Sequence, residues 1–290
     1  MANGILIVDK PAGWTSQDVA AKLRGVFREK RVGHGGTLDP MATGVLPIFV
    51  GRATRAVPFF EHADKVYAAV LRLGLVTDTQ DITGRTLQEQ PVSITKAELE
   101  AVLPRFRGSI EQIPPMYSAI KVGGQKLYAL ARQGKEVARK PRPVTIFKLE
   151  AGEGEGRDWP LLIHCSKGTY VRTLCHDVGQ ALGCGGCMAA LRRTRAGAFD
   201  LSGAYTMEQI LAAPDPERLL LPVDSLFSDC PALTVNAAGE QRLRNGATLR
   251  VSGRPDGQYR VYAASGEFLL LAQIREQTLS TIKSFFEPAL

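Results

Sequence analysis

The sequence lacks several features that would assign it to a class of protein at once. Its apolar runs fall well short of the roughly 18–20 residues that span a bilayer. It contains no Walker loop, no G-x-G-x-x-G after a predicted strand and no H-E-x-x-H. The N-terminal stretch, residues 1–16, lacks the basic n-region of a signal peptide. We therefore expect a cytoplasmic protein, not associated with a membrane, that works without a nucleotide cofactor or an obligatory metal.

Cysteine is scarce, and the odd number of five argues against a secreted disulfide framework. Cys184 and Cys187 form one C-x-x-C, and two histidines and two more cysteines lie within residues 164–176. A zinc site is therefore one alternative. A second C-x-x-C or an H-x₃₋₅-H at zinc-finger spacing is absent, however, as is the H-x-E with P-C-x-x-C of a zinc deaminase. We expect reduced, mostly buried thiols and no metal.

The positive charge is unevenly distributed along the chain. The formal net charge of the chain is +7. Residues 121–148 contain eight basic residues and one acidic residue, so this segment alone carries a charge equal to that of the whole chain. A solvated helix face would explain such a segment. We interpret it instead as a surface that grips a polyanion, most simply the phosphates of a nucleic acid.

Predicted strands and helices mix without a regular alternation. Strands are predicted at residues 5–8, 45–50, 66–73, 117–122, 144–150 and 161–165, and helices after Thr15 or Ser16, after Thr95, at 125–133 and after Thr169. This mixture favours an α+β fold around a mixed or antiparallel sheet. Prolines near residues 214–231 suggest a domain boundary, with a larger domain at 1–229 and a small β-rich domain at 230–290.

Three side chains stand out as candidates for chemistry. Asp39 follows a glycine-rich stretch and precedes Pro40, Tyr67 begins a predicted strand, and Arg172 lies in the first turn of a predicted helix. Each has a structural alternative: a turn former, a core tyrosine and a surface arginine. Together they suit a reaction on a base or sugar that needs one ionised carboxylate in a dry pocket. The arginines of residues 191–195 are read as either solvated or in contact with phosphate.

Several long motifs, in order and in register, resemble the bacterial tRNA pseudouridine synthase B family over about residues 4–200. They are G-H-G-G-T-L-D-P-x-A-T-G-x-L-P (33–47), K-x-Y (65–67), T-D-T-x-D (77–81), I-P-P-M-Y-S-A-I-K (113–121) and H-C-S-K-G-T-Y-V-R-T (164–173). The resemblance implies a pseudouridine-synthase domain followed by a PUA-like RNA-binding domain. It also implies conversion of the T-loop uridine of tRNA, position 55, to pseudouridine. The expected partner is the T-arm of tRNA, and no protein partner or cofactor is implied.

The resemblance also implies which residues act on the uridine. Asp39 matches the catalytic aspartate of the family, and Arg172 matches the arginine that pairs with it. Tyr67 matches the tyrosine that stacks on the target uracil and is the proposed proton acceptor. These three are the expected catalytic residues.

Five further positions match substrate-binding residues of the family. His34 matches the histidine that stacks in the space left by the flipped bases, and Tyr170 and Leu191 match pocket positions. Lys10 matches the lysine of the K-P motif, and Asp81 matches the acid of T-D-T-x-D.

One position departs from the family pattern, because Gly35 stands where members often carry threonine. We expect the glycine to loosen the loop while leaving His34 and Asp39 in place. The rival interpretation is a non-catalytic RNA-binding or RNA-folding protein that uses the same basic surface. The presence of Asp39, Tyr67 and Arg172 together argues against it.

Overall fold

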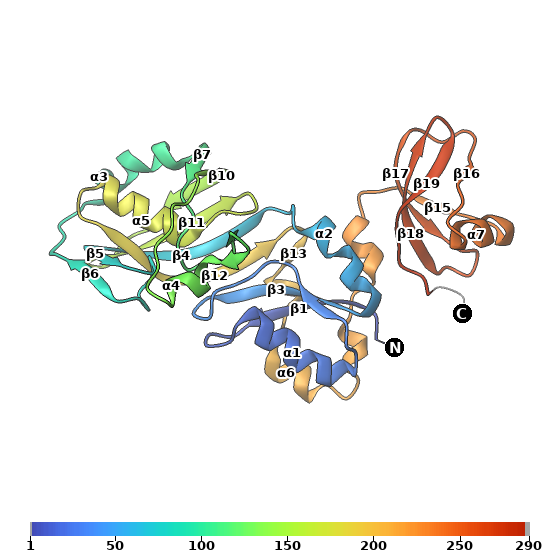
Figure 1. Cartoon of the computed structure of the whole chain (residues 1–290), viewed down its shortest axis with the longest axis horizontal. Helices are drawn as coiled ribbons and strands as arrows, with labels where there is room; N and C mark the ends of the chain where they lie inside the picture. Colours follow the sequence, from blue (N-terminus) through green and yellow to red (C-terminus); the bar gives the residue numbers. More distant parts are fainter. Residues whose placement is uncertain (1, 288–290) are drawn as a thin grey trace.

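In the computed structural model, which describes residues 2–287, the chain forms a long ten-stranded sheet and a separate five-stranded sheet (Figure 1). The path through the larger sheet is β14 (Tyr205–Thr206), β1 (Gly4–Lys10), β3 (Thr43–Val50), β12 (Gly186–Ala196), β4 (Lys65–Leu73), β11 (Asp158–Cys165), β10 (Arg142–Ala151) and β7 (Gly108–Gln112). β2 (Val32–His34) pairs with β3, and β13 (Phe199–Asp200) pairs with β12. The β1–β14 and β3–β12 pairs are parallel and the others are antiparallel, so the predicted mixed sheet is confirmed.

Helices cover the larger sheet at both ends. The α-helices of the described chain are α1 (Ser16–Phe27), α2 (Val57–Phe60), α3 (Lys96–Val102), α4 (Leu127–Ala131), α5 (Val171–Ala181), α6 (Met207–Ala212) and α7 (Ala237–Arg244). Figure 1 shows α1 and α6 beside β1 and β3, and α3 and α5 beside β10 and β11. Within residues 2–287, no helix is long and apolar enough to cross a membrane.

Two of the three predicted helix-capping residues are confirmed. Thr15 and Thr95 each form a capping box, accepting the backbone N–H three residues on, while the acid at that position accepts the N–H of the threonine. The third start is wrong by one residue, because Tyr170 is the N-cap of α5 and makes no side-chain cap. The hydroxyl of Thr169 donates instead to the carbonyl of Ser166, 3.0 Å away, which closes the turn before the helix.

β12 is the longest strand and lies at the centre of the sheet, yet the sequence analysis did not predict it. It pairs in parallel with β3 and antiparallel with β4. The loop before β3 and the first residues of β4 are thereby brought to the same part of the sheet. The close approach of β3 requires Gly44, since its φ is +99° and a Cβ there would lie 2.2 Å from the carbonyl oxygen of Arg193.

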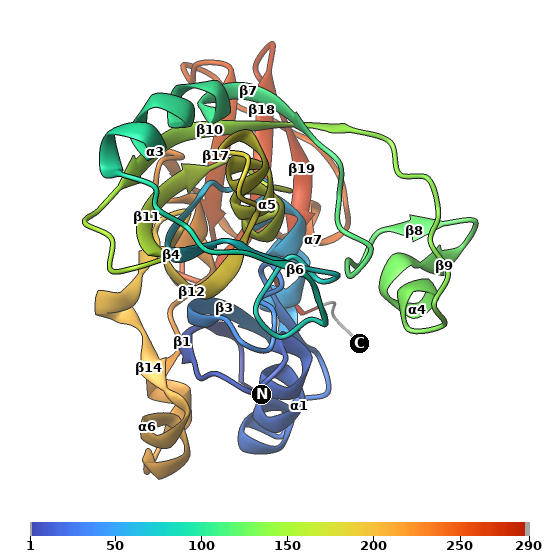
Figure 2. The same cartoon turned by 90° about the vertical axis from the view of Figure 1, so that its left-hand side faces the viewer.

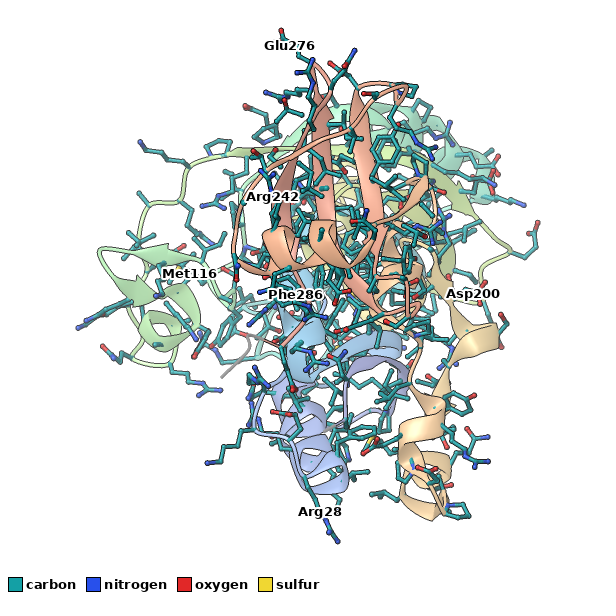
Figure 3. All side chains as sticks on the ribbon, turned by 90° about the vertical axis from the view of Figure 1, so that its right-hand side faces the viewer. Arg28, Met116, Asp200, Arg242, Glu276 and Phe286 are labelled. Carbon is teal, nitrogen blue, oxygen red and sulfur yellow. The ribbon has the colours of Figure 1, made fainter. Side chains whose placement is uncertain are left out.

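The segment between β7 and β10, residues 113–141, is called the basic arm below; it projects from the body of the molecule (Figure 2). The predicted strand at 117–122 is wrong: only β8 (Lys121–Val122) is extended, in a hairpin with β9 (Gln125–Lys126). The predicted helix at 125–133 shortens to α4, because β9 occupies its first two residues. The arm lacks the apolar alternation needed to join the sheet. Figure 3 shows it from the opposite side, with Met116 labelled.

The five-stranded sheet runs β15 (Ala232–Thr234), β17 (Gly257–Tyr262), β18 (Phe268–Arg275), β19 (Thr278–Ser284) and β16 (Leu249–Arg250). The remaining elements are β5 (Leu75–Thr77) and β6 (Thr86–Glu89), which form a hairpin, and the 3-10 segments η1 (Gly51–Ala56), η2 (Leu103–Phe106), η3 (Leu201–Gly203), η4 (Pro216–Leu219) and η5 (Val223–Phe227). The five-stranded sheet packs against the part of the chain that contains the ten-stranded sheet, and phenylalanines form the contact. Phe227 lies 5.4 Å from Phe59 and 5.9 Å from Phe285 between ring centroids. This shared apolar cluster fixes how the smaller sheet is docked.

Candidate active site

Asp39 lies in the loop between β2 and β3, and the residues on both sides of it are tied down. The backbone N–H of Leu38 donates to the hydroxyl of Ser16 at 2.8 Å, and the N–H of Gly13 donates to the carbonyl of Pro40 at 2.8 Å. Both partners belong to the segment formed by α1 and the turn before it. The carboxyl group is therefore held in one position, with 34% of its side chain exposed.

Lys10 strengthens the same attachment from the end of β1. Its side chain is 0% exposed, and its ammonium group donates to the carbonyls of Pro11 (2.8 Å), Trp14 (2.6 Å) and Pro40 (3.3 Å). All three N–H groups are used inside the protein, so this lysine supports the loop and does not reach outward. Burial lowers the pKa of Lys10 from 10.5 to about 8, and the nearby carboxylate of Asp39 opposes that shift.

Replacing Lys10 with methionine is expected to lower the free energy of unfolding by roughly 1–3 kcal/mol, because three partly buried hydrogen bonds to backbone carbonyls are lost. Between about pH 8 and 10.5 the unfolded wild type binds more protons than the folded protein, so its stability rises with pH. The methionine variant lacks this contribution, and its deficit should widen across that window. Urea unfolding at both ends of the window measures it; an exposed control, Lys22→Met, should show no such widening.

Asp39 forms a two-point ion pair with Arg172 of α5. The Nε of Arg172 lies 2.9 Å from Oδ2 of Asp39, and its Nη2 donates to Oδ1 at 3.3 Å. Burial raises the pKa of Asp39 above its ordinary value, while the guanidinium of Arg172 works in the opposite direction. Burial thus makes the Asp39 carboxylate bind a proton more tightly, and the adjacent Arg172 cation favours the ionised carboxylate.

Arg172 is itself buried and held from three more directions. Its Nη1 donates to the carbonyl of Thr79 at 3.1 Å, and its Nη2 donates to the carbonyl of Tyr117 at 2.8 Å. Asp81 lies behind it, with Oδ2 3.7 Å from Nη1. The other oxygen of Asp81 accepts the backbone N–H of Thr83 at 2.9 Å, which fixes the loop. Asp39, Arg172 and Asp81 therefore form one charge network, in which Arg172 and Asp81 are buried and Asp39 is partly exposed.

Tyr67 and Tyr170 lie near Asp39, and Leu191 packs in the same apolar cluster as Tyr67. Tyr67 and Leu191 are inward-facing residues of β4 and β12, and both are buried. Tyr170 is half-buried, and the amide of the buried Gln112 bonds both its N–H (3.0 Å) and its C=O (3.3 Å). Burial raises the pKa of both phenols, and Asp39 is near enough to add to each shift.

His34 ends β2 and is half-buried. Its Nδ1 is buried and has no hydrogen-bond partner among residues 2–287. Burial and the positive charge of Arg193 lower the pKa of this imidazole, which favours the neutral ring. Gly35, next to it, does not loosen the loop as expected. Its N–H donates to the carbonyl of Pro47 at 2.8 Å, and the Phe60 ring fills the place of a side chain, 2.5 Å from where a Cβ would lie.

Two residues of this region were missed by the sequence analysis, Gln112 and Arg193. Gln112 gave no signal, because its contact depends on the approach of β7 to α5. Arg193 lies two residues after Leu191, so the two-residue period of a strand would have placed both on one face. That signal went unused because β12 was not predicted.

The described chain, residues 2–287, contains no group of three or more His, Cys, Asp or Glu side chains placed to hold a metal ion. The thiol of Cys184 contacts the carbonyl of Gly185 at 3.4 Å, and burial raises the pKa of Cys187 to about 11. These are the protonated thiols of a packed interior, and the zinc alternative has no set of ligands there.

Comparisons with known proteins agree with the motifs at this site. Residues 24–171 match the N-terminal domain of the TruB family pseudouridylate synthases, and residues 172–228 match the tRNA pseudouridylate synthase B C-terminal domain. A tRNA pseudouridine synthase B of Pseudomonas fluorescens is 44% identical over 281 residues, which cover 94% of this chain and 92% of that protein. The protein of the same name from Shigella dysenteriae is 41% identical over 289 residues, covering 95% and 92%.

Solved structures show the same fold at lower identity. A Cbf5–Nop10–Gar1 complex contains a chain with a TM-score of 0.73 and 24% identity, covering 98% of this chain and 85% of that one. An H/ACA RNP bound to a substrate RNA contains one with a TM-score of 0.73 and 22% identity, covering 99% and 86%. The motifs, the fold and the extent of the identity lead to one conclusion: the chain belongs to the TruB family of pseudouridylate synthases.

Proposed function

We propose that this protein converts the T-loop uridine of tRNA, position 55, to pseudouridine, with Asp39 as the catalytic carboxylate. The observation that carries the proposal is the two-point pair between Asp39 and Arg172 in a buried network. The names of the relatives, tRNA pseudouridine synthase B, support the substrate. A tRNA substrate also goes with the cytoplasmic location expected from the sequence.

The proposed reaction rearranges the substrate and needs no second reactant. The N1–C1′ bond of the uridine breaks, the uracil turns, a C5–C1′ bond forms, and the proton on C5 is lost while N1 gains one. Asp39 acts as an anion, either as a nucleophile or as a stabiliser and base at the sugar. Arg172 favours that anion. Tyr67 stacks on the uracil and, with Leu191, confines it while it turns.

The target base must leave its stack before Asp39 can reach the sugar, which costs a few kcal/mol. Stacking of a protein ring on the neighbouring bases offsets part of this cost, by roughly 1–3 kcal/mol per base. The neutral imidazole of His34, five positions before Asp39 on the same loop, is the proposed ring. Tyr170 contributes to the pocket, while Lys10 and Asp81 act indirectly, through the loop of Asp39 and through Arg172.

We also propose two surfaces that grip the RNA outside the pocket. The basic arm is the first, because most of its cations are exposed. The second is the unit of the five-stranded sheet, as a PUA-like RNA-binding domain. The proposed domains are residues 1–229 and 230–290. Their outer ends, residue 1 and residues 288–290, lie outside the described residues.

The direct test is pseudouridine formation on an unmodified tRNA transcript, with the modified position mapped. The proposal expects modification of the T-loop uridine without added metal or cofactor. Tight binding of the transcript without modification would favour the non-catalytic RNA-binding alternative. Modification at another position would refute the assignment of the T-loop uridine as substrate, while the assignment of the protein as a pseudouridine synthase would stand.

Neutralising Lys121, Lys126 and Lys135 together as glutamines is expected to flatten the salt dependence of tRNA binding. All three are exposed on the basic arm. Removing one lysine–phosphate interaction should reduce the slope of log Kd against log salt by about one. Filter binding over a salt series measures the slope. The matched control neutralises the exposed cations Lys22 and Lys30; equal slopes for both variants would contradict the assignment.

A further inference from the structure

Arg193 is the most deeply buried arginine side chain near the site, at 1% exposure. Among residues 2–287 it forms no salt bridge with a carboxylate. Its neighbours on β12 are different, because Arg192 and Arg195 are each 41% exposed and pair with Asp9 and Asp64. A charge buried without an opposite charge is costly, so its retention here calls for a specific role. For the arginines of residues 191–195 the sequence offered two interpretations, solvation or contact with phosphate. Neither applies to Arg193, because its side chain is enclosed.

The guanidinium bonds to both ends of the Asp39 loop. Its Nη2 donates to the carbonyl of Gly36 at 3.1 Å, and its Nε donates to the carbonyl of Val45 at 2.7 Å. Gly36 precedes Asp39 and Val45 follows it. Because a guanidinium is planar and rigid, these two bonds fix the separation of the loop ends.

Arg193 also lies beside Tyr67. The two are directly opposite residues in the β4–β12 pairing, so their side chains lie next to each other on one face of the sheet. The charged and titratable groups around the phenol are Arg193 from β12, Cys165 from β11 and Asp39 from the loop. Among them Arg193 is the cation, and its charge counteracts the rise that burial causes in the pKa of Tyr67.

We propose that Arg193 is a positioning residue that clamps the ends of the Asp39 loop and sets the place of the Tyr67 ring relative to Asp39. This inference rests on the proposed function for its effect on turnover, but the clamp itself is a property of the free protein. Loss of the clamp takes the arginine donor from the buried carbonyl of Val45 and from the partly buried carbonyl of Gly36, and it lets the loop and the ring move apart. Misplacement of reacting groups by about 1 Å costs roughly a hundredfold in rate.

The test uses the full chain labelled with fluorotyrosine and followed by fluorine NMR, with the Tyr67 signal assigned by its loss in Tyr67→Phe. In Arg193→Met, the Tyr67 signal should shift and titrate at higher pH, and turnover should fall roughly a hundredfold with little change in tRNA affinity. Arg193→Lys keeps the charge and should partly restore the titration and the turnover. Arg105→Gln, at an exposed position of η2, should behave as wild type.

An unshifted Tyr67 signal together with unchanged turnover in Arg193→Met would overturn the inference. If Arg193→Met does not fold, the Tyr67 signal of Arg193→Lys serves as the test of the inference. One ammonium cannot reproduce both bonds of the fork, so the Tyr67 signal should still shift, and an unshifted signal overturns the clamp. Failure of wild type to modify tRNA would refute the proposed function instead, because the NMR signal needs no RNA.

Discussion

Replacing Asp39 with asparagine is expected to abolish pseudouridine formation, by roughly a thousandfold or more, while tRNA binding persists. Asparagine has nearly the same shape, so Leu38 and Pro40 keep their bonds to the segment of α1. The amide carries no charge, however, and cannot act as a nucleophile or base at the sugar. Single-turnover modification and filter binding, measured side by side, separate the two effects. Asp200→Asn, at the exposed end of β13, is the control that should leave both unchanged.

The same substitution tests the electrostatics of Asp39 through stability. The pKa of Asp39 is raised in the folded protein, so the folded state binds this proton more tightly than the unfolded chain. Stability therefore falls as the pH rises from the ordinary carboxyl value through the raised value. Asparagine lacks this penalty. The variant should melt at a higher temperature than wild type at neutral pH, and the difference should vanish in acid; a constant difference would contradict the raised pKa.

Replacing Arg172 with methionine should lower turnover by roughly a hundredfold to a thousandfold, with a much smaller loss of tRNA affinity. Without the guanidinium, the pKa of Asp39 should rise further, because its strongest opposing influence is gone. The pH at which activity is half-developed should move upward, and part of the loss should be recovered at higher pH. A variant that had merely lost its fold would show no such recovery.

The matched control is Arg172→Lys, which keeps one positive charge. Lysine cannot form the two-point pair or bond both Thr79 and Tyr117, so its pH profile should lie between wild type and the methionine variant. Circular dichroism establishes that each variant is folded. Equal losses of turnover and tRNA affinity in Arg172→Met would show that the arginine binds RNA and does not tune Asp39.

Local features of the chain were predictable because their causes lie within a few residues. The capping boxes at Thr15 and Thr95 each need only four consecutive residues. The apolar run 66–73, which ends at Gly74, predicts β4 from its own composition. The motif around Asp39 likewise indicated a bent loop next to a strand, and the structure has one.

By itself, then, the sequence determined the short-range elements, the mixed sheet and the family, through motifs that each occupy a few positions. Tertiary structure decided what those motifs do to one another. Arg172 reaches Asp39 across 133 residues, and Arg193 becomes a clamp only because β12 inserts between β3 and β4. A stretch with three arginines has the composition of a surface, so its burial follows only from strand pairings formed far apart in the chain. Such pairings are selected by the packing of the whole sheet, which no local window contains.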